Sequence, residues 1–331
     1  MLAVQFVGIV VFVSFFSNSN ASTDITLYIS SGAVVIIIFL YSIFGGLKKD
    51  ILTDVIQVIF IFLGVGAIVL FGNMAKDISS LTASFSSTDL SLKGKYNFIF
   101  LVGVLLFVPA TFFARYDIWQ RIFTAKDNST AKNSFYISGF IAMLFFCFFG
   151  CMGLYARAMN IDVSNDQFVA LEVINSRLAG IPFALAFIAF FAAVMSSADT
   201  FLGAASLSLM KLFPTPHNDS TDQRNRFRIV SLIVGIAAIL ISLCFFDIIE
   251  LFSIAFGILM VFLPTIFVAL FRKTPQNMES FLSILLGLTA FCVGVFYFPK
   301  EAFVLSLIVS AFVYFFVYIF VSVINLNRTI S

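Results

Sequence analysis

Apolar stretches of roughly 20 residues recur along almost the whole of this sequence, and a helix of about that length crosses the hydrocarbon core of a bilayer. Because a bilayer offers no water to backbone groups, only helices and closed barrels span it, and the sequence lacks the short alternating strands of a barrel. Among its 331 residues, 61% are hydrophobic and only 11% are charged, which is far from the composition of soluble domains. We therefore expect an all-α, polytopic membrane helical bundle.

The lengths of the apolar stretches predict about ten transmembrane helices and no soluble domain. Their expected bounds are residues 2–17, 26–47, 51–74, 98–115, 134–158, 181–212, 228–247, 249–271, 279–298 and 302–324. The first stretch is short, and the small residues of SNSNAS after it also fit a cleaved signal peptide. No basic residue precedes it, which counts against that alternative.

Basic residues are concentrated on one side of the predicted helices. That side holds Lys48, Lys49, Arg121, Lys126, Lys132, Lys211, Arg224, Arg226, Arg228, Arg272, Lys273 and Arg328. The positive-inside rule makes it the cytoplasmic side. Both termini are then predicted to be cytoplasmic, and the polar segments 75–97 and 158–180 are predicted to be extracellular loops.

The remaining composition argues against several classes of protein. The sequence contains no basic block of the kind that binds nucleic acid. All four cysteines lie inside apolar segments, without the spacing of metal ligands or disulfides. His217, the single histidine, has no partner identifiable by spacing that would form a nucleophile and base pair. We therefore expect neither a nucleic-acid partner nor an enzyme.

One predicted helix carries an unusual polar patch in the stretch AAVMSSADTFLGAAS, residues 192–206. On a helix, Ser196, Asp199 and Thr200 share a face, and an ionisable residue within a membrane helix is a functional candidate by default. Hydroxyl, carboxylate and carbonyl oxygens suit a hard monovalent cation such as sodium. The alternative is structural: the hydroxyls bond back to the preceding turn, and Asp199 is hydrated near the inner end of its helix.

Two other features share this ambiguity between function and structure. Asp54 lies in the first predicted turn of its helix, where it either contacts an ion or stabilises the helix N-terminus, and Gln57 beside it is explained by packing. Pro109 interrupts an apolar helix, either as a break that frees carbonyls beside a cavity or as an ordinary kink. Arg115 and Asp117 follow it, and they either pair with groups on other helices or reach the lipid headgroups.

Three stretches together resemble the sodium:solute symporter family. AAVMSSADTFLGAASLSLMKLF is similar to the family's eighth core helix, and FGGLKKDILTDVIQ, residues 44–57, resembles its Gly-Gly turn with the following Thr-Asp and Gln. WQRIFTAKD, residues 119–127, is similar to the pattern just inside the sixth core helix. The resemblance extends from about Ala3 to about Lys273 and implies a leucine-transporter-type inverted-repeat fold in a membrane, for which we expect the bacterial cytoplasmic (inner) membrane.

The resemblance implies two groups of sodium ligands. The carbonyl of Ala193 and the hydroxyls of Ser196 and Ser197 would form half of the main sodium site. In some relatives a second sodium site exists, and the corresponding positions here are Asp54, Asp199 and Thr200. An aspartate at position 199 departs from the serine of those relatives, so a second ion at this position is open.

The resemblance also implies where a solute would bind. Broken helices build the binding site at the bilayer midplane in transporters of this architecture. Counting back from Gln120 and Arg121 within the sixth core helix gives Ala110, Thr111, Phe112 and Phe113 as the solute-facing positions. Sugars, amino acids, carboxylates, sialic acids and urea are all within the family's range, and the sequence does not choose among them.

The same alignment of motifs implies an incomplete core. If the serine-rich segment is core helix eight, residues 1–273 hold core helices three to ten and residues 274–331 hold two additional helices. Core helices one and two, with half of the sodium ligands, would then be missing from this N-terminally truncated member. A separate N-terminal fragment would be the partner that supplies them.

The expected function is sodium-coupled secondary active transport of a small organic solute by alternating access, with Na⁺ as the coupling ion and with activity impaired if the core is truncated. The alternatives are a non-transporting membrane sensor or scaffold, and an inactive fragment of a split or decayed symporter. An attached signalling domain would favour a sensor, and Ser331 follows directly after the last predicted helix.

Overall fold

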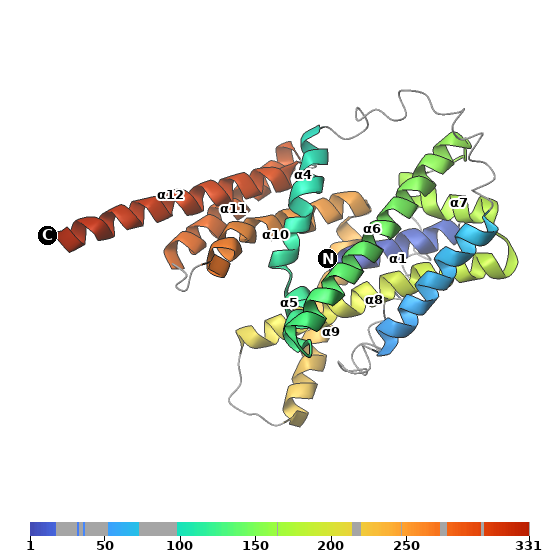
Figure 1. Ribbon diagram of the computed structural model, residues 1–331, viewed down its shortest axis with the longest axis horizontal. Coiled ribbons are helices and arrows are strands. Elements are labelled where there is room, and N and C mark those ends of the chain that lie inside the picture. Colours follow the sequence, from blue (N-terminus) through green and yellow to red (C-terminus); the bar gives the residue numbers. More distant parts are fainter. Residues whose placement is uncertain are drawn as a thin grey trace. The chain divides into compact units, whose positions relative to one another are not determined.

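The computed structural model describes residues 1–17, 32, 36, 52–72, 98–163, 165–213, 220–245, 247–271, 277–298 and 301–330, and the secondary structure in these ranges is entirely helical (Figure 1). Seven described helices are long and apolar enough to cross a membrane, or eight if the bent pair Phe98–Ala114 and Tyr116–Thr124 is one span. This confirms an all-helical, multi-pass membrane protein. The predicted number of ten stays a prediction, because nearly all of segment 26–47 lies outside the described residues.

The chain divides into two compact units. The first combines residues 1–90 with residues 124–248. Its described elements are α1 (Leu2–Ser17), a helix over Leu52–Phe71 (the unlabelled light-blue helix in Figure 1), α6 (Asn128–Ala158), the 3₁₀ turn η3 (Asp166–Phe168), α7 (Val169–Arg177), α8 (Gly180–Leu212) and α9 (Ser220–Cys244).

The core of the first unit forms where α1 packs against α8. The ring of Phe12 lies 5.3 Å from that of Phe187, 5.0 Å from that of Phe190 and 4.6 Å from that of Phe191, measured between centroids. Such aromatic contacts add to the burial of a large apolar area. They fix the extracellular half of α8, as the predicted orientation has it, against a buried helix.

The predicted loop 158–180 is wrong in part, because its centre is helical. In α7 the side chains of Leu171, Val173 and Ile174 are buried and pack in one cluster with Met152 and Tyr155 of α6. An apolar face that finds a partner stabilises a short helix that would be marginal alone. The helix was not predicted because the segment also contains many polar residues.

α6 begins at Asn128, six residues before the position that apolar length predicted. Asp127 is the N-cap residue, and its carboxylate accepts a hydrogen bond of 2.6 Å from the backbone N–H of Thr130. Such a cap satisfies an N–H group that the helix itself leaves unpaired. The polar first turn therefore belongs to the helix although it adds nothing to its apolar length.

The second unit combines residues 91–123 with residues 249–331. Its elements are α4 (Phe98–Ala110), the 3₁₀ turn η2 (Thr111–Ala114), α5 (Tyr116–Thr124), α10 (Ile248–Phe271), α11 (Asn277–Tyr297) and α12 (Ala302–Ile330). Met260, Leu263 and Phe303 form its core, with Phe100 and Ala110 packed against them. This division reflects how compactly the residues pack, whereas the predicted division at residue 273 separated the symporter core from two additional helices. The division at residue 273 therefore stays a prediction.

Candidate functional site

The helix Leu52–Phe71 packs closely against α8 in the first unit. A Cβ atom built on Gly64 would overlap the Cβ of Ala189 and would lie 2.7 Å from the carbonyl oxygen of Leu185. Small residues at a helix interface let two backbones approach in this way. Gly64 is therefore a point of direct backbone contact between the two helices.

A second contact between the same helices joins two of the predicted site residues. The hydroxyl Oγ of Ser196 donates a hydrogen bond of 2.7 Å to Oδ1 of Asp54, and the contact is partly buried. A hydrogen bond to a carboxylate is stronger than one between neutral groups. The alternative in which Ser196 bonds back to its own helix does not hold in this structure.

These two contacts define how the helices run past each other. Asp54 meets Ser196, and Gly64, further along its helix, meets Leu185 and Ala189, earlier in α8. The two helices are therefore antiparallel. Their backbones touch at Gly64, and their side chains form a hydrogen bond at Asp54.

The other predicted residues on α8 differ in accessibility. Asp199 is 3% exposed, whereas Ser197 and Thr200 are half-buried and Ala193 is exposed. The buried position of Asp199 differs from the hydrated one that the structural alternative assumed. Because Asp54 bonds to Ser196, one residue of each predicted sodium group contributes to a single cluster.

The following turns of α8 are anchored by structural hydroxyls. Ser206 donates to the carbonyl of Leu202 and accepts a hydrogen bond of 2.9 Å from Ser231 of α9, while Ser208 donates to the carbonyl of Ala204. Here the predicted back-bonding of serines to the preceding turn does occur. These serines provide a comparison for Ser196, whose hydroxyl bonds to another helix.

The side chains of the predicted sodium ligands Asp54, Ser196, Ser197, Asp199 and Thr200 offer only oxygen donors. Within the described part of the chain, no group of three or more His, Cys, Asp or Glu side chains forms a metal site. Hydroxyl and carboxylate oxygens without nitrogen or sulfur are the ligands that hard cations prefer. The donor set therefore fits an alkali cation.

The predicted solute-facing residues lie in the second unit, at a break in the helix. α4 continues through Pro109 to Ala110, tightens into η2, and ends at Arg115, where the backbone is extended. The direction of the chain changes by 57° before α5. The break predicted at Pro109 is therefore real but lies just after the proline.

The four predicted positions face different surroundings. Ala110 packs against the core around Met260, and Thr111 is fully buried with its hydroxyl donating to the carbonyl of Val108 over 2.6 Å. Phe112 and Phe113 are 48% and 42% exposed. The two phenylalanines are therefore the most exposed of the four predicted positions.

Side chains next to the break hold it together. Arg115 donates to both carboxylate oxygens of Asp117, with distances of 3.1 Å from Nε and 2.6 Å from Nη2, and its guanidinium lies 5.2 Å from the ring centroid of Phe112. Trp119 Nε1 donates to the carbonyl of Phe113 over 2.8 Å. Arg115 and Asp117 were expected either to pair with groups on other helices or to reach the lipid headgroups, and in the structure they pair with each other.

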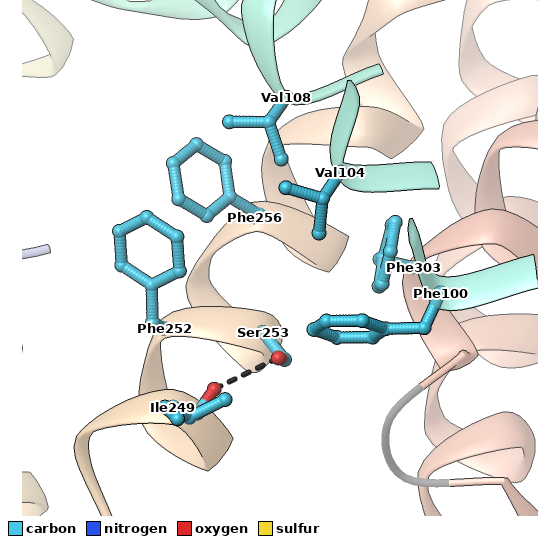
Figure 2. A pocket seen from close by; sticks show the side chains of 8 residues that line it. All are labelled: Phe100, Val104, Val108, Ile249, Phe252, Ser253, Phe256 and Phe303. Atoms are coloured by element: carbon cyan, nitrogen blue, oxygen red, sulfur yellow. Dashed lines mark hydrogen bonds between the residues drawn. The ribbon is translucent and has the colours of Figure 1, made fainter. Parts of the chain in front are cut away.

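A cavity of about 260 Å³ lies elsewhere in the second unit, between α4, α10 and α12 (Figure 2). Figure 2 shows phenylalanine and aliphatic side chains around it, with Ser253 as the polar side chain of the lining. That hydroxyl donates to the carbonyl of Ile249 over 2.8 Å. The cavity is therefore apolar and offers little to recognise a polar solute.

Comparison with known proteins identifies the family of this chain. The model of the sodium:solute symporter family matches residues 2–287. The chain belongs to the sodium:solute symporter family. It is therefore an integral, multi-pass membrane transporter that couples solute movement to Na⁺, and not an enzyme.

The fold of this symporter is similar to that of a Na⁺-coupled sialic acid symporter, solved in a substrate-bound outward-open state and reported to reveal a novel Na⁺ site. The TM-score is 0.64 at 15% sequence identity, over 94% of this chain and 69% of the other. This confirms the expected leucine-transporter-type fold, and at this identity the likeness shows the fold alone. A search of curated proteins gave no match.

Sequence reasoning did not reveal two residues of the symporter's helix Leu52–Phe71. Gly64 was not predicted, because the sequence does not show whether a glycine in an apolar helix contacts another backbone. Gln57 was explained by packing, and its 8% exposure agrees with that, but its amide oxygen has no hydrogen-bond partner among the described residues. The available signal was the spacing of Asp54, Gln57 and Gly64, which places all three on one helical face.

Proposed function

We propose that Asp54, Ser196 and Ser197, with the carbonyl of Ala193, bind the coupling sodium ion of this symporter. The observation that supports the proposal best is the hydrogen bond from Ser196 to Asp54. It brings a carboxylate and a hydroxyl together between two membrane helices, where polar groups are costly unless they are used. Asp199 and Thr200, one turn further along α8, are proposed as the second group of ion-binding residues.

The hydrogen bond has a chemical consequence for ion binding. A hydroxyl that donates its proton to a carboxylate still has two lone pairs for a cation. Because the carboxylate draws the proton toward itself, the Ser196 oxygen becomes a better electron donor, as groups behind a first ligand do in metal sites. Asp54 would then act both as a ligand and as the group that orients Ser196.

Sodium binding drives transport if the ion favours one conformation of the protein over the other. Ligands on the helix Leu52–Phe71 and on α8 would both contact the ion, so its occupancy would stabilise the arrangement in which these helices are close. We propose alternating access of a small organic solute on this basis. Phe112 and Phe113, exposed beside the helix break, are the proposed solute contacts, with half-buried Ala110 and buried Thr111 as their support.

We also propose where the protein lies in the cell and where the remaining sodium ligands come from. By the positive-inside rule the termini are cytoplasmic, in a bacterial inner membrane. The family resemblance implies that core helices one and two hold the other half of the main-site ligands, and we propose that a separate N-terminal fragment supplies them.

Thermal unfolding of the purified full chain in NaCl and in KCl at equal ionic strength tests the sodium site without knowledge of the solute. A ligand that binds only the folded state stabilises it by about 2.7 kcal/mol at 100 times its Kd. We expect NaCl to raise the unfolding temperature of the wild type, and Ser196→Ala and Ser197→Ala to reduce that rise. Ser208→Ala is the matched control, because its hydroxyl bonds within its own helix.

Two results would contradict the proposal. One is a wild-type protein whose unfolding temperature is the same in NaCl and KCl. The other is a Ser196→Ala variant that responds to NaCl as strongly as Ser208→Ala does.

A further inference from the structure

Gln57 is a buried polar residue that the proposed sodium site does not yet use. Its side chain is 8% exposed, and its oxygen Oε1 has no hydrogen-bond partner within the described part of the structure. Buried polar atoms almost always have a partner, so each exception requires a specific explanation. An amide oxygen accepts hydrogen bonds or coordinates a cation, and it donates nothing.

The position of Gln57 on its helix places it between the two contacts with α8. Gln57, Gly64 and Ile68 are buried, whereas Val58 and Ile59 are exposed, so the helix has one buried face with a spacing of three and four residues. Asp54 lies on that face, one turn before Gln57. The side chain of Gln57 therefore lies on the same side as the carboxylate that contacts Ser196.

The antiparallel register identifies what lies opposite. Asp54 is opposite Ser196, and Gly64 is opposite Leu185 and Ala189, so Gln57 is level with the turn of α8 around Ala192 and Ala193. Alanine side chains offer no hydrogen-bond donor, and the backbone N–H groups in the middle of a helix are already used. Neither can satisfy the amide oxygen.

The amide oxygen of Gln57, for which no described residue is a hydrogen-bond partner, lies between two contacts of its helix with α8. These are the backbone contact at Gly64 and the hydrogen bond between Asp54 and Ser196. A neutral amide oxygen is a regular ligand of hard cations, beside carboxylates and backbone carbonyls.

We propose that Oε1 of Gln57 is a further ligand of the sodium ion, bound together with Asp54 and Ser196. This inference rests on the proposed function of that cluster. It assigns to the helix Leu52–Phe71 two ion ligands one turn apart, a charged one and a neutral one. The ion would then be held deeper between the helices than by the hydroxyls of α8 alone.

The test compares Gln57→Met with Gln57→Glu in the full chain, with NaCl as the probe and KCl as the reference. Methionine keeps the length and flexibility of the side chain but has no oxygen, and glutamate keeps the oxygens. The measured quantity is the NaCl concentration that gives half of the maximal rise in unfolding temperature. We expect Gln57→Met to increase it roughly 10-fold, as for loss of one interaction with a charged partner, and Gln57→Glu to keep it near or below the wild-type value.

The unfolding temperature in KCl separates ion binding from packing. A role in packing alone predicts that Gln57→Met is at least as stable as the wild type in KCl and has the same sodium requirement, and that result would overturn the inference. Asp54→Asn and Ser196→Ala are measured in parallel. If they raise the sodium requirement and Gln57→Met does not, only the role of Gln57 is wrong; if none of the three does, the sodium cluster itself is wrong.

Discussion

Ser196 donates a hydrogen bond of 2.7 Å to Asp54, which lies 142 residues earlier in the chain and on a different helix. The pair has a direct energetic consequence, because removing either group takes a hydrogen-bond partner from the other. The contact also connects the two helices that carry the proposed sodium ligands. A change at either residue should therefore alter ion binding and helix packing together.

We predict that Asp54 and Ser196 are energetically coupled. In a double-mutant cycle with Asp54→Asn and Ser196→Ala, the two changes together should cost less than the sum of the single changes, by about 0.5–3 kcal/mol. The free energy of unfolding in NaCl is the quantity to measure. Ser208→Ala combined with Asp54→Asn is the control pair and should be additive.

We predict that Gly64→Ala destabilises the protein, because the added methyl group would overlap Ala189. Overpacking of this kind costs about 1–3 kcal/mol. Gly66→Ala is the matched control on the same helix, since a Cβ there meets nothing within 4 Å, and alanine is the better helix former by about 1 kcal/mol. If Gly64→Ala and Gly66→Ala have the same unfolding temperature, the close approach of the two helices at Gly64 is contradicted.

We predict that Asp117→Asn loosens the helix break in the second unit. The variant removes the negative charge that receives two hydrogen bonds from Arg115, and the side chain of Asp117 is only 8% exposed. Hydrogen bonds to charged groups contribute about 1.5–3 kcal/mol, so the unfolding free energy should fall by roughly that amount. The control Asp222→Asn, at an exposed aspartate of α9, should change stability by less than about 0.5 kcal/mol.

We predict a pH-dependent contribution from the N-cap of α6. The backbone N–H of Thr130 donates to Asp127 and lowers the pKa of that carboxyl below its usual 3.8. Because the folded-state pKa is the lower one, the stabilisation is complete above the unfolded-state pKa and is lost as the pH falls through the folded-state pKa. In Asp127→Asn, the asparagine side chain still caps the helix but does not change its charge with pH. The difference in unfolding free energy between wild type and Asp127→Asn should therefore be constant near neutral pH and should change only below about pH 4. A difference that changes between pH 5 and pH 8 would contradict this assignment.

The sequence predicted the helices well and their partners poorly. Apolar length is a property of each segment alone, so the bounds of α8 and α10 were predicted to within a residue or two. The N-terminal turns of α6 and the whole of α7 were missed, because a cap and a buried face contribute little to apolar length. Arg115 and Asp117 were expected to pair with groups on other helices or to reach the lipid headgroups, and they form an ion pair with each other within one short segment, since the backbone direction at the break decides which groups meet.

The sequence by itself determined that this chain lies in a membrane, because apolar length and low charge leave no other environment for such helices, and its motifs indicated the family. Only the tertiary structure decided that Asp54 meets Ser196 and that Gly64 touches α8. The physical reason is that hydropathy depends on neighbours along the chain, whereas a hydrogen bond between helices depends on register and distance. Gln57 illustrates the difference, since its spacing gives the face on which it lies, and only the tertiary structure shows that its oxygen has no hydrogen-bond partner among the described residues.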